Sequence, residues 1–168
     1  MATLYTHQSK NVRKTWFLMT TFFVMIVFIG YGFSYYYGNI NILYIFFAFA
    51  LFMNLFSYWN SAKIAIKMSG AQPADENQYR ELHNIVENLS ITAGLPKPKV
   101  YIINDNAPNA FATGRDKNHS AVAVTTGLMQ ILEKNELEGV IAHELSHIGN
   151  RDILVSTVAV VLAGFITI

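Results

Sequence analysis

The chain has 168 residues, of which 52% are hydrophobic and 14% charged, and its formal net charge is +1. Its mean hydropathy of +0.29 is higher than expected for an ordinary soluble domain. The near-neutral charge argues against nucleic acid as a partner, and the absence of cysteine excludes disulfides and thiolate metal ligands.

Two long apolar runs dominate the first third of the chain, from Trp16 to Phe33 and from Ile42 to Trp59. Each would be about 27 Å long as a helix, close to the hydrocarbon thickness of a bilayer. Aromatic residues collect at the ends of both runs, where an interfacial belt would place them. The alternative, two buried helices in a soluble protein, would need a larger surrounding domain than this chain provides. The sequence therefore predicts transmembrane helices over 16–37 and 42–59, joined by an external turn over 38–41.

The charges that flank these runs predict their orientation. Five cations flank the two runs on their outer sides, namely Lys10, Arg13, Lys14, Lys63 and Lys67, whereas the turn between the runs has no lysine or arginine. The positive-inside rule therefore puts both ends of the hairpin, including segment 1–15, in the cytoplasm. A cleaved signal peptide is the competing interpretation, but the apolar core is too long and no small-residue cleavage site follows it. The first run is predicted to be a signal anchor.

Polar residues then continue to Asp152, which predicts a cytoplasmic domain over 60–152. Asp75 and Gln78 resemble a capping box that opens a helix, and Gly94 with Pro96 ends it. His83 on that helix is expected to be a partly exposed structural histidine.

Short strands and helices are predicted for the rest of this domain. The strands are expected at Val100–Ile103, Asn109–Gly114 and Ser120–Thr125, and a short helix at Gly127–Leu132. The polar segment Arg115–His119 is expected to be a hairpin loop with an exposed His119. A second capping-box pattern, Asn135 and Glu138, is expected to start the next helix.

The most specific feature is the motif His143-Glu144-Leu145-Ser146-His147 on that helix. Histidines four apart lie about 40° apart around a helix axis, so both imidazoles can reach one cation. The glutamate between them is held within one turn of the cation, where it can accept a proton from a metal-bound water. The motif predicts a zinc peptidase site, with His143 and His147 as ligands and Glu144 as the general base.

A third apolar run, Ile153 to Ile168, begins directly after Arg151 and Asp152. It would be about 24 Å long as a helix, which is short for a bilayer crossing. We therefore expect residues 153–168 to be the start of a third transmembrane helix, and the sequence to be a fragment of a longer protein. Arg151 and Asp152 either orient a metal ligand through hydrogen bonds or end the metal-bearing helix, and both interpretations stay open.

These features together resemble a known family. The apolar spans, the segment Asn109-Ala110-Phe111-Ala112-Thr113-Gly114 and the motif His143–His147 are similar to HtpX, a family of membrane-integrated zinc metalloproteases of bacteria related to the CAAX prenyl proteases. The similarity extends over the whole chain. It implies an α+β zincin-like domain of the gluzincin type, incomplete over 60–152 and attached to transmembrane α-helices. It also implies an active site on the cytoplasmic face of the plasma membrane, where misfolded or damaged membrane proteins are cleaved.

The resemblance also implies roles for individual residues. His143 and His147 match the zinc ligands and Glu144 the catalytic glutamate, with one Zn²⁺ per chain. The third ligand in the family is a glutamate on a downstream helix, which residues 1–168 do not contain. The metzincin alternative would need glycine at position 150 and histidine at position 153, where Asn150 and Ile153 stand.

The resemblance further suggests a substrate-binding strand. In related zincins an edge strand beside the metal pairs with the extended substrate backbone, so Asn109, Ala110 and Phe111 are expected to contact substrate. The expected partners are protein or peptide substrates and the lipid bilayer. Two other functions stay open: a catalytically silent membrane scaffold or regulatory fragment that lacks the third zinc ligand, and a CAAX-type prenyl-peptide protease.

Overall fold

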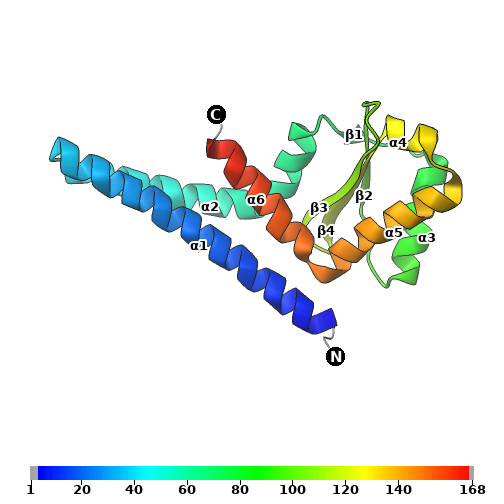
Figure 1. Ribbon diagram of the computed structural model, residues 1–168, viewed down its shortest axis with the longest axis horizontal. Coiled ribbons are helices and arrows are strands. Elements are labelled where there is room, and N and C mark those ends of the chain that lie inside the picture. The colour runs from blue at the N-terminus through cyan, green and yellow to red at the C-terminus, as the bar shows by residue number, and fades with distance from the viewer. Residues whose placement is uncertain (1–3, 167–168) are drawn as a thin grey trace.

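The computed structural model describes residues 4–166, and within its helices and strands the side chains of residues 9–160. Two long helices, α1 (Leu4–Tyr37) and α2 (Ile40–Met68), form an antiparallel hairpin that projects from one side of a mixed α/β domain (Figure 1). Asn39 begins α2 as its N-cap, because its side chain accepts the backbone N–H of Asn41. Within the described residues, these two helices are long and apolar enough to cross a membrane.

Both helices extend beyond the predicted spans 16–37 and 42–59. Neither residues 5–15 nor residues 60–68 contain the glycine or proline that would end a helix. The first helix therefore begins at Leu4, inside the predicted segment 1–15, and the second continues to Met68. Residues 1–3 of that segment lie outside the described residues.

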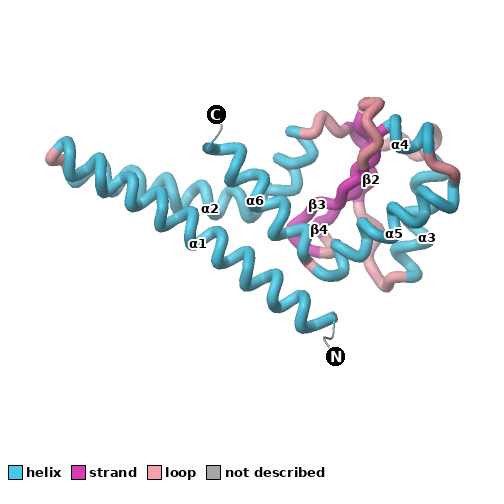
Figure 2. Tube along the Cα trace, in the orientation of Figure 1, coloured by secondary structure: helices cyan, strands magenta, loops and turns pink. Residues whose placement is uncertain are grey.

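The α/β domain is built on a four-stranded sheet in the order β1-β2-β4-β3. Figure 2 shows the strands in magenta, with helices around them. The strands are β1 (Gln72–Pro73), β2 (Lys99–Ile103), β3 (Ala110–Asp116) and β4 (His119–Thr125). The pair β2–β4 is parallel, whereas β1–β2 and β3–β4 are antiparallel. The three predicted strands are confirmed, but β1 was not predicted because two residues carry no periodic signal. This order leaves β3 on an edge of the sheet.

The hairpin between β3 and β4 is tighter than predicted. The expected loop Arg115–His119 is wrong at both ends, because Asp116 and His119 are paired strand residues. The Asp116 carboxylate accepts the backbone N–H groups of Asn118 and His119 at 2.9 and 3.0 Å. These bonds close the turn over two residues.

Two helix starts also differ from prediction. The first helix of the domain, α3 (Arg80–Thr92), begins after Asp75 rather than at it. The Asp75 carboxylate accepts the N–H groups of Asn77 and Gln78 and so closes a turn ahead of the helix. The end of α3 is as predicted, with Gly94 at φ +64 just beyond it.

The second difference is at the helix that carries the HExxH motif, α5 (Lys134–Asn150), which follows a short α4 (Thr126–Ile131). A capping box is present, but it is formed by Glu133 and Glu136 rather than by Asn135 and Glu138. Glu136 accepts the backbone N–H of Glu133 at 2.9 Å, which lets the helix begin at Lys134.

Helices cover both faces of the sheet. On one face α3 and α5 pack against β2 and β4, and the fully buried side chains there are Leu82, Val86, Val122, Val124, Ile141, Leu145 and Ile148. On the other face lies the end of α2, where Ile66 packs with Ala121 and Ala123 of β4. Burial on both faces explains the continuous apolar run Ala121–Val124 in the middle of β4. The sheet domain is therefore packed directly against the helical hairpin.

The last helix, α6 (Asp152–Ile166), runs back along α1 and α2 (Figure 1). Its Leu154 and Val158 are buried against Met19 and Phe22 of α1. The predicted third apolar helix is thus confirmed as a helix to Ile166, while residues 167–168 lie outside the described residues. Arg151, at φ 58, forms the left-handed bend between α5 and α6.

Candidate metal centre

One helix brings together the three residues of the predicted site. His143, Glu144 and His147 of α5 each offer one possible ligand atom, and these atoms all lie within 4.8 Å of one another. The two imidazole Nε2 atoms are 3.1 Å apart, and the ring planes meet at 85°. His143 is exposed and the other two side chains are partly exposed, so the group is open to solvent on one side. The packing of Ile141, Leu145 and Ile148 on the opposite side of α5 fixes this orientation.

The distance between the two Nε2 atoms fits a shared zinc ion. Two nitrogens bound at roughly 2.0–2.1 Å to a tetrahedral zinc would lie about 3.3 Å apart. The observed 3.1 Å is close to that separation. The donor set of two imidazoles and no thiolate is also one that zinc accepts.

Asp152 orients one of these rings. Its Oδ2 lies 2.8 Å from Nδ1 of His147. An ionised carboxylate can only accept a hydrogen bond, so the proton of a neutral His147 ring belongs on Nδ1 and the lone pair on Nε2. That lone pair then points toward His143, as metal binding requires. Of the two interpretations of Asp152 that the sequence left open, the contact supports orientation of a ligand, and Arg151 is the residue that caps the helix.

Glu144 is held by the edge strand. Its Oε2 accepts the backbone N–H of Ala112 in β3 at 2.9 Å. A buried bond between the hydroxyls of Thr113 and Thr157, 2.9 Å apart, fixes the next residue of β3 to α6. The carboxylate is thus positioned by β3, which is distant in sequence from α5, and β3 is itself fixed to α6.

The predicted substrate residues Asn109, Ala110 and Phe111 lie at the start of the edge strand. Asn109 precedes β3, and its backbone N–H and C=O are bonded to Thr125, the last residue of β4. Backbone groups of alternate residues in a strand point to opposite sides. Those of Ala110 and Ala112 therefore face the free edge, beside the metal-binding group.

An apolar cavity adjoins the same strand. It has a volume of about 380 Å³ and is bounded by Phe111 and Thr113 of β3, by Met68 of α2 and by Val160 of α6. The cavity extends from the edge strand toward the helices that the sequence predicts to enter the membrane.

Comparison with known sequences identifies the family. Residues 76–168, more than half of the chain, match the profile of Peptidase family M48. The chain belongs to peptidase family M48. Its mixed α/β domain is accordingly a zincin-like metallopeptidase domain, attached to two apolar helices.

Several curated M48 relatives resemble the chain over most of its length. The Protease HtpX homolog of Thermoanaerobacter pseudethanolicus is 48% identical over 165 residues, which cover 98% of this chain and 55% of the relative. The Protease HtpX homolog of Pyrococcus furiosus is 53% identical over 137 residues, covering 82% of this chain and 47% of the relative. The chain spans about half the length of the curated relatives that it matches. The predicted similarity to HtpX is confirmed.

The other two histidines of the sheet domain lie apart from the M48 motif. The Nε2–H of His83 donates a hydrogen bond to the carbonyl of Ala74, 3.1 Å away, which agrees with a structural role. His119 is exposed at the β3–β4 hairpin and contacts Asp116. Neither belongs to the metal-binding group found among the described residues.

Sequence analysis missed the role of the Ala112 N–H in this M48 site. A backbone amide carries no residue-specific signal, and its contact with Glu144 joins residues separated by 32 positions. Asp152 follows His147 by only five residues, so the sequence suggested that the two side chains could meet. It could not show whether the Asp152 carboxylate turns toward the His147 ring.

Proposed function

We propose that the protein is a membrane-integrated zinc endopeptidase of the gluzincin type. The observation that carries this proposal is the pair of Nε2 atoms 3.1 Å apart, beside a glutamate held by an edge strand. Membership of a peptidase family and similarity to HtpX homologs support it. The resemblance to HtpX implies that a downstream glutamate of the full-length protein completes the ligand set.

The residues present can perform defined parts of peptide hydrolysis. His143 and His147 would hold the zinc ion, and bound zinc would supply a Lewis acid that lowers the pKa of a water to about 7. Glu144 accepts the proton of the attacking water and then delivers it to the leaving amine. Ala112 directs the carboxylate toward the ligands through its N–H, and Asp152 keeps the coordinating nitrogen of His147 free of a proton.

The edge strand supplies a way to bind substrates with little sequence preference. An extended peptide that lies along β3 would pair with the outward backbone groups of Ala110 and with the carbonyl of Ala112, because the Ala112 N–H is already bonded to Glu144. The side chain of Phe111 and the apolar cavity beside it would receive apolar side chains of the substrate. We therefore propose misfolded or damaged membrane proteins as substrates, with Asn109 positioning the start of the strand.

The flanking charges support a location in the plasma membrane with the sheet domain in the cytoplasm. In this arrangement α1 and α2 cross the bilayer, and the metal centre lies near its inner surface. The packing of α6 on α1 and α2 fits a third helix that enters the membrane.

Substitution of the proposed base tests this function. In the full-length protein, Glu144→Gln should keep zinc but lower the rate of cleavage of an unfolded membrane protein by very roughly 10²-fold or more, because it removes the group that accepts the proton. Glu138→Gln on the same helix is the matched control and should keep near-normal turnover. The measurements are zinc content by elemental analysis and cleavage of the substrate over time.

The same assay separates the alternatives. Unchanged turnover of Glu144→Gln would reject its role as base. Absence of zinc and of cleavage in the unsubstituted full-length protein would favour a silent scaffold. A strong preference for a prenylated peptide over its unmodified form would favour a CAAX-type protease.

A further inference from the structure

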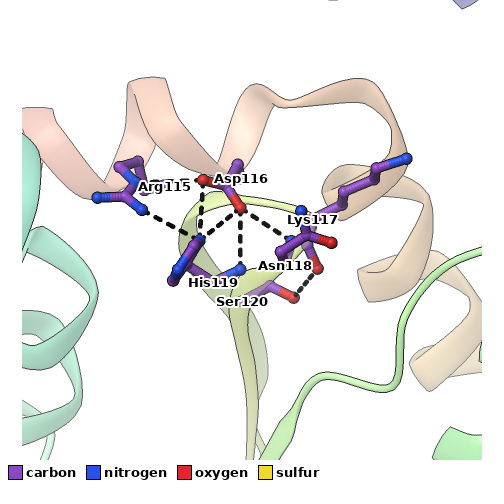
Figure 3. Close-up of polar contacts among 6 residues, drawn as sticks. All are labelled: Arg115, Asp116, Lys117, Asn118, His119 and Ser120. Atoms are coloured by element: carbon purple, nitrogen blue, oxygen red, sulfur yellow. Dashed lines mark hydrogen bonds and ion pairs between the residues drawn. The ribbon is translucent and has the colours of Figure 1, made fainter.

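The tip of the β3–β4 hairpin lies where the sheet domain meets the helical hairpin. Its turn residues Lys117 and Asn118 project beside the junction of α5 and α6 (Figure 3). The Asp116 carboxylate is turned into the hairpin, where it bonds the backbone of the turn. It also accepts the Nε–H of Arg115 at 3.1 Å and contacts Nδ1 of His119 at 2.8 Å. The carboxylate of Asp116, the one acidic side chain at this tip, is therefore bonded by groups of the hairpin itself.

Arg115 joins the β3–β4 hairpin to the end of the second predicted span through a side-chain contact. Its guanidinium lies over the ring of Trp59, 4.3 Å from the ring centroid. Such a cation–π contact holds an arginine at an aromatic residue of the membrane interface. The charged hairpin is thereby placed at the level where α2 is predicted to leave the bilayer.

A cleft of about 300 Å³ lies between this hairpin and the two helices. Its polar side is formed by the hairpin and by Arg151, and its other side by Trp16 of α1, Tyr58 of α2 and Leu154 of α6. Three cationic side chains line it, namely Arg115, Lys117 and Arg151. In the part of the chain that the structure describes, neither Lys117 nor Arg151 forms an ion pair. The cleft thus presents unpaired positive charge against an aromatic and apolar wall.

Arg151 occupies an unusual backbone position. It is the one non-glycine residue with a positive φ among the described residues, at 58°. This left-handed position at the end of a helix favours glycine or asparagine, and an arginine there needs a compensating reason. A ligand for its exposed guanidinium in the cleft would supply that reason.

The walls of the cleft indicate the kind of anion. Trp16 and Tyr58 lie at the ends of the two predicted spans, at the depth where lipid headgroups lie. A small soluble anion would gain little from aromatic and apolar walls. A phosphodiester whose glycerol continues into acyl chains would satisfy the cations and the apolar wall together.

We propose that this cleft binds the phosphate group of an anionic phospholipid from the leaflet on the side of the sheet domain. Lys117 and Arg151 contact the phosphate, and Trp16 and Tyr58 flank the glycerol. The proposal rests on the membrane placement of α1 and α2 but is independent of the peptidase chemistry. Because Arg151 joins α5 to α6, a bound lipid would also brace the helix that carries the M48 motif.

Lipid binding to the purified full-length protein in detergent tests the proposal. Native mass spectrometry would measure the apparent Kd for phosphatidylglycerol and for phosphatidylcholine. The test variant is Lys117→Gln with Arg151→Asn, since asparagine tolerates the left-handed backbone. The matched control is Arg80→Asn with Lys134→Gln, which removes two exposed cations at the starts of α3 and α5, away from α1 and α2 (Figure 1).

We expect phosphatidylglycerol to bind at least about tenfold more tightly than phosphatidylcholine, and the test variant to lose about tenfold in that affinity while the control stays within about twofold. Lys117→Gln alone should weaken phosphatidylglycerol binding roughly threefold. Because this residue lies on the exposed turn, the single variant still tests the site if the double variant fails to fold. Equal losses in test and control variants, or unchanged binding in the test variant, would overturn the proposal. Displacement of the lipid by equimolar glycerol 3-phosphate or inorganic phosphate would overturn it as well, because it would indicate a site for soluble anions.

Discussion

A carboxylate five residues beyond His147 decides which nitrogen of that ring faces the proposed zinc ion. Asp152→Asn keeps the size of the side chain but removes the charge that holds a proton on Nδ1. We expect zinc affinity to fall about 10–100-fold, as is typical when the hydrogen-bond partner of a ligating histidine is lost. Competition with a chromogenic chelator on the full-length protein would measure the change. Asp75→Asn serves as the control, because Asp75 closes a turn ahead of α3. Equal zinc affinities in the unsubstituted protein and in both variants would contradict the role of Asp152.

Asp116 links the stability of the hairpin to pH. Burial raises the pKa of its carboxyl, but hydrogen bonds from His119 and Arg115 and from the backbone of Asn118 outweigh burial, so the pKa lies below its ordinary value. A carboxyl with a depressed folded-state pKa contributes stability above its unfolded pKa of about 3.9, and this contribution is lost as the pH falls through the folded-state pKa.

Substitution at this position should therefore reduce stability mainly at neutral pH. Asp116→Asn can still accept backbone N–H groups but loses its ionic contacts, at a cost of roughly 0.5–1 kcal/mol at pH 7. The difference from the unsubstituted protein should vanish at a pH well below 4, as followed by thermal unfolding in detergent. Asp75→Asn is the control, since in the described structure its carboxylate caps backbone N–H groups without a cationic side chain. A stability difference at pH 7 that persisted unchanged in acid would contradict this assignment.

At the scale of the element, α5 presents its ligands only because its other side is anchored in the core. Ile141 is fully buried between α3 and the sheet. Ile141→Ala should lower the free energy of unfolding by about 3 kcal/mol, because it removes buried methyl groups and leaves a cavity. Ile91→Ala on α3, where the side chain is 71% exposed, is the matched control and should change stability by less than about 0.5 kcal/mol.

The measurement for this pair is the midpoint of thermal unfolding, with zinc affinity as a second readout. A loss of zinc affinity in Ile141→Ala at temperatures where the protein is still folded would show that packing positions the ligands. Equal midpoints for the two alanine variants would mean that α5 is not held by this core.

For the whole molecule, the decisive property is the orientation of the helical hairpin in the membrane. Positive charges at its base predict that the turn between α1 and α2 lies outside and the sheet domain inside. The described sequence has no cysteine, so single cysteines can report exposure in a cysteine-free background. In intact cells a membrane-impermeant maleimide should label Asn41→Cys, whereas Gln78→Cys should react only after permeabilisation. The reverse labelling pattern would show that the domain lies outside.

The sequence by itself determined what depends on local spacing. Apolar length predicted both long helices, short runs bounded by turn residues predicted three strands, and the motif His143–His147 predicted a group that the structure brings within 4.8 Å. It erred at the starts of α3 and α5 and at the hairpin loop. In each case a carboxylate bonds the local backbone in a way that spacing does not specify: Asp75 closes a turn ahead of α3, Glu136 bonds the backbone of Glu133 at the start of α5, and Asp116 closes the hairpin.

Only the tertiary structure decided what lies around the motif. The contact of Ala112 with Glu144, the turn of Asp152 toward His147 and the placement of Arg115 on Trp59 depend on how the edge strand, α5, α6 and α2 pack. Periodicity specifies which side of an element is apolar but not which neighbour covers it. The ligand-bearing helix could therefore be found in the chain, whereas the strand that positions its glutamate and the cleft beside it could not.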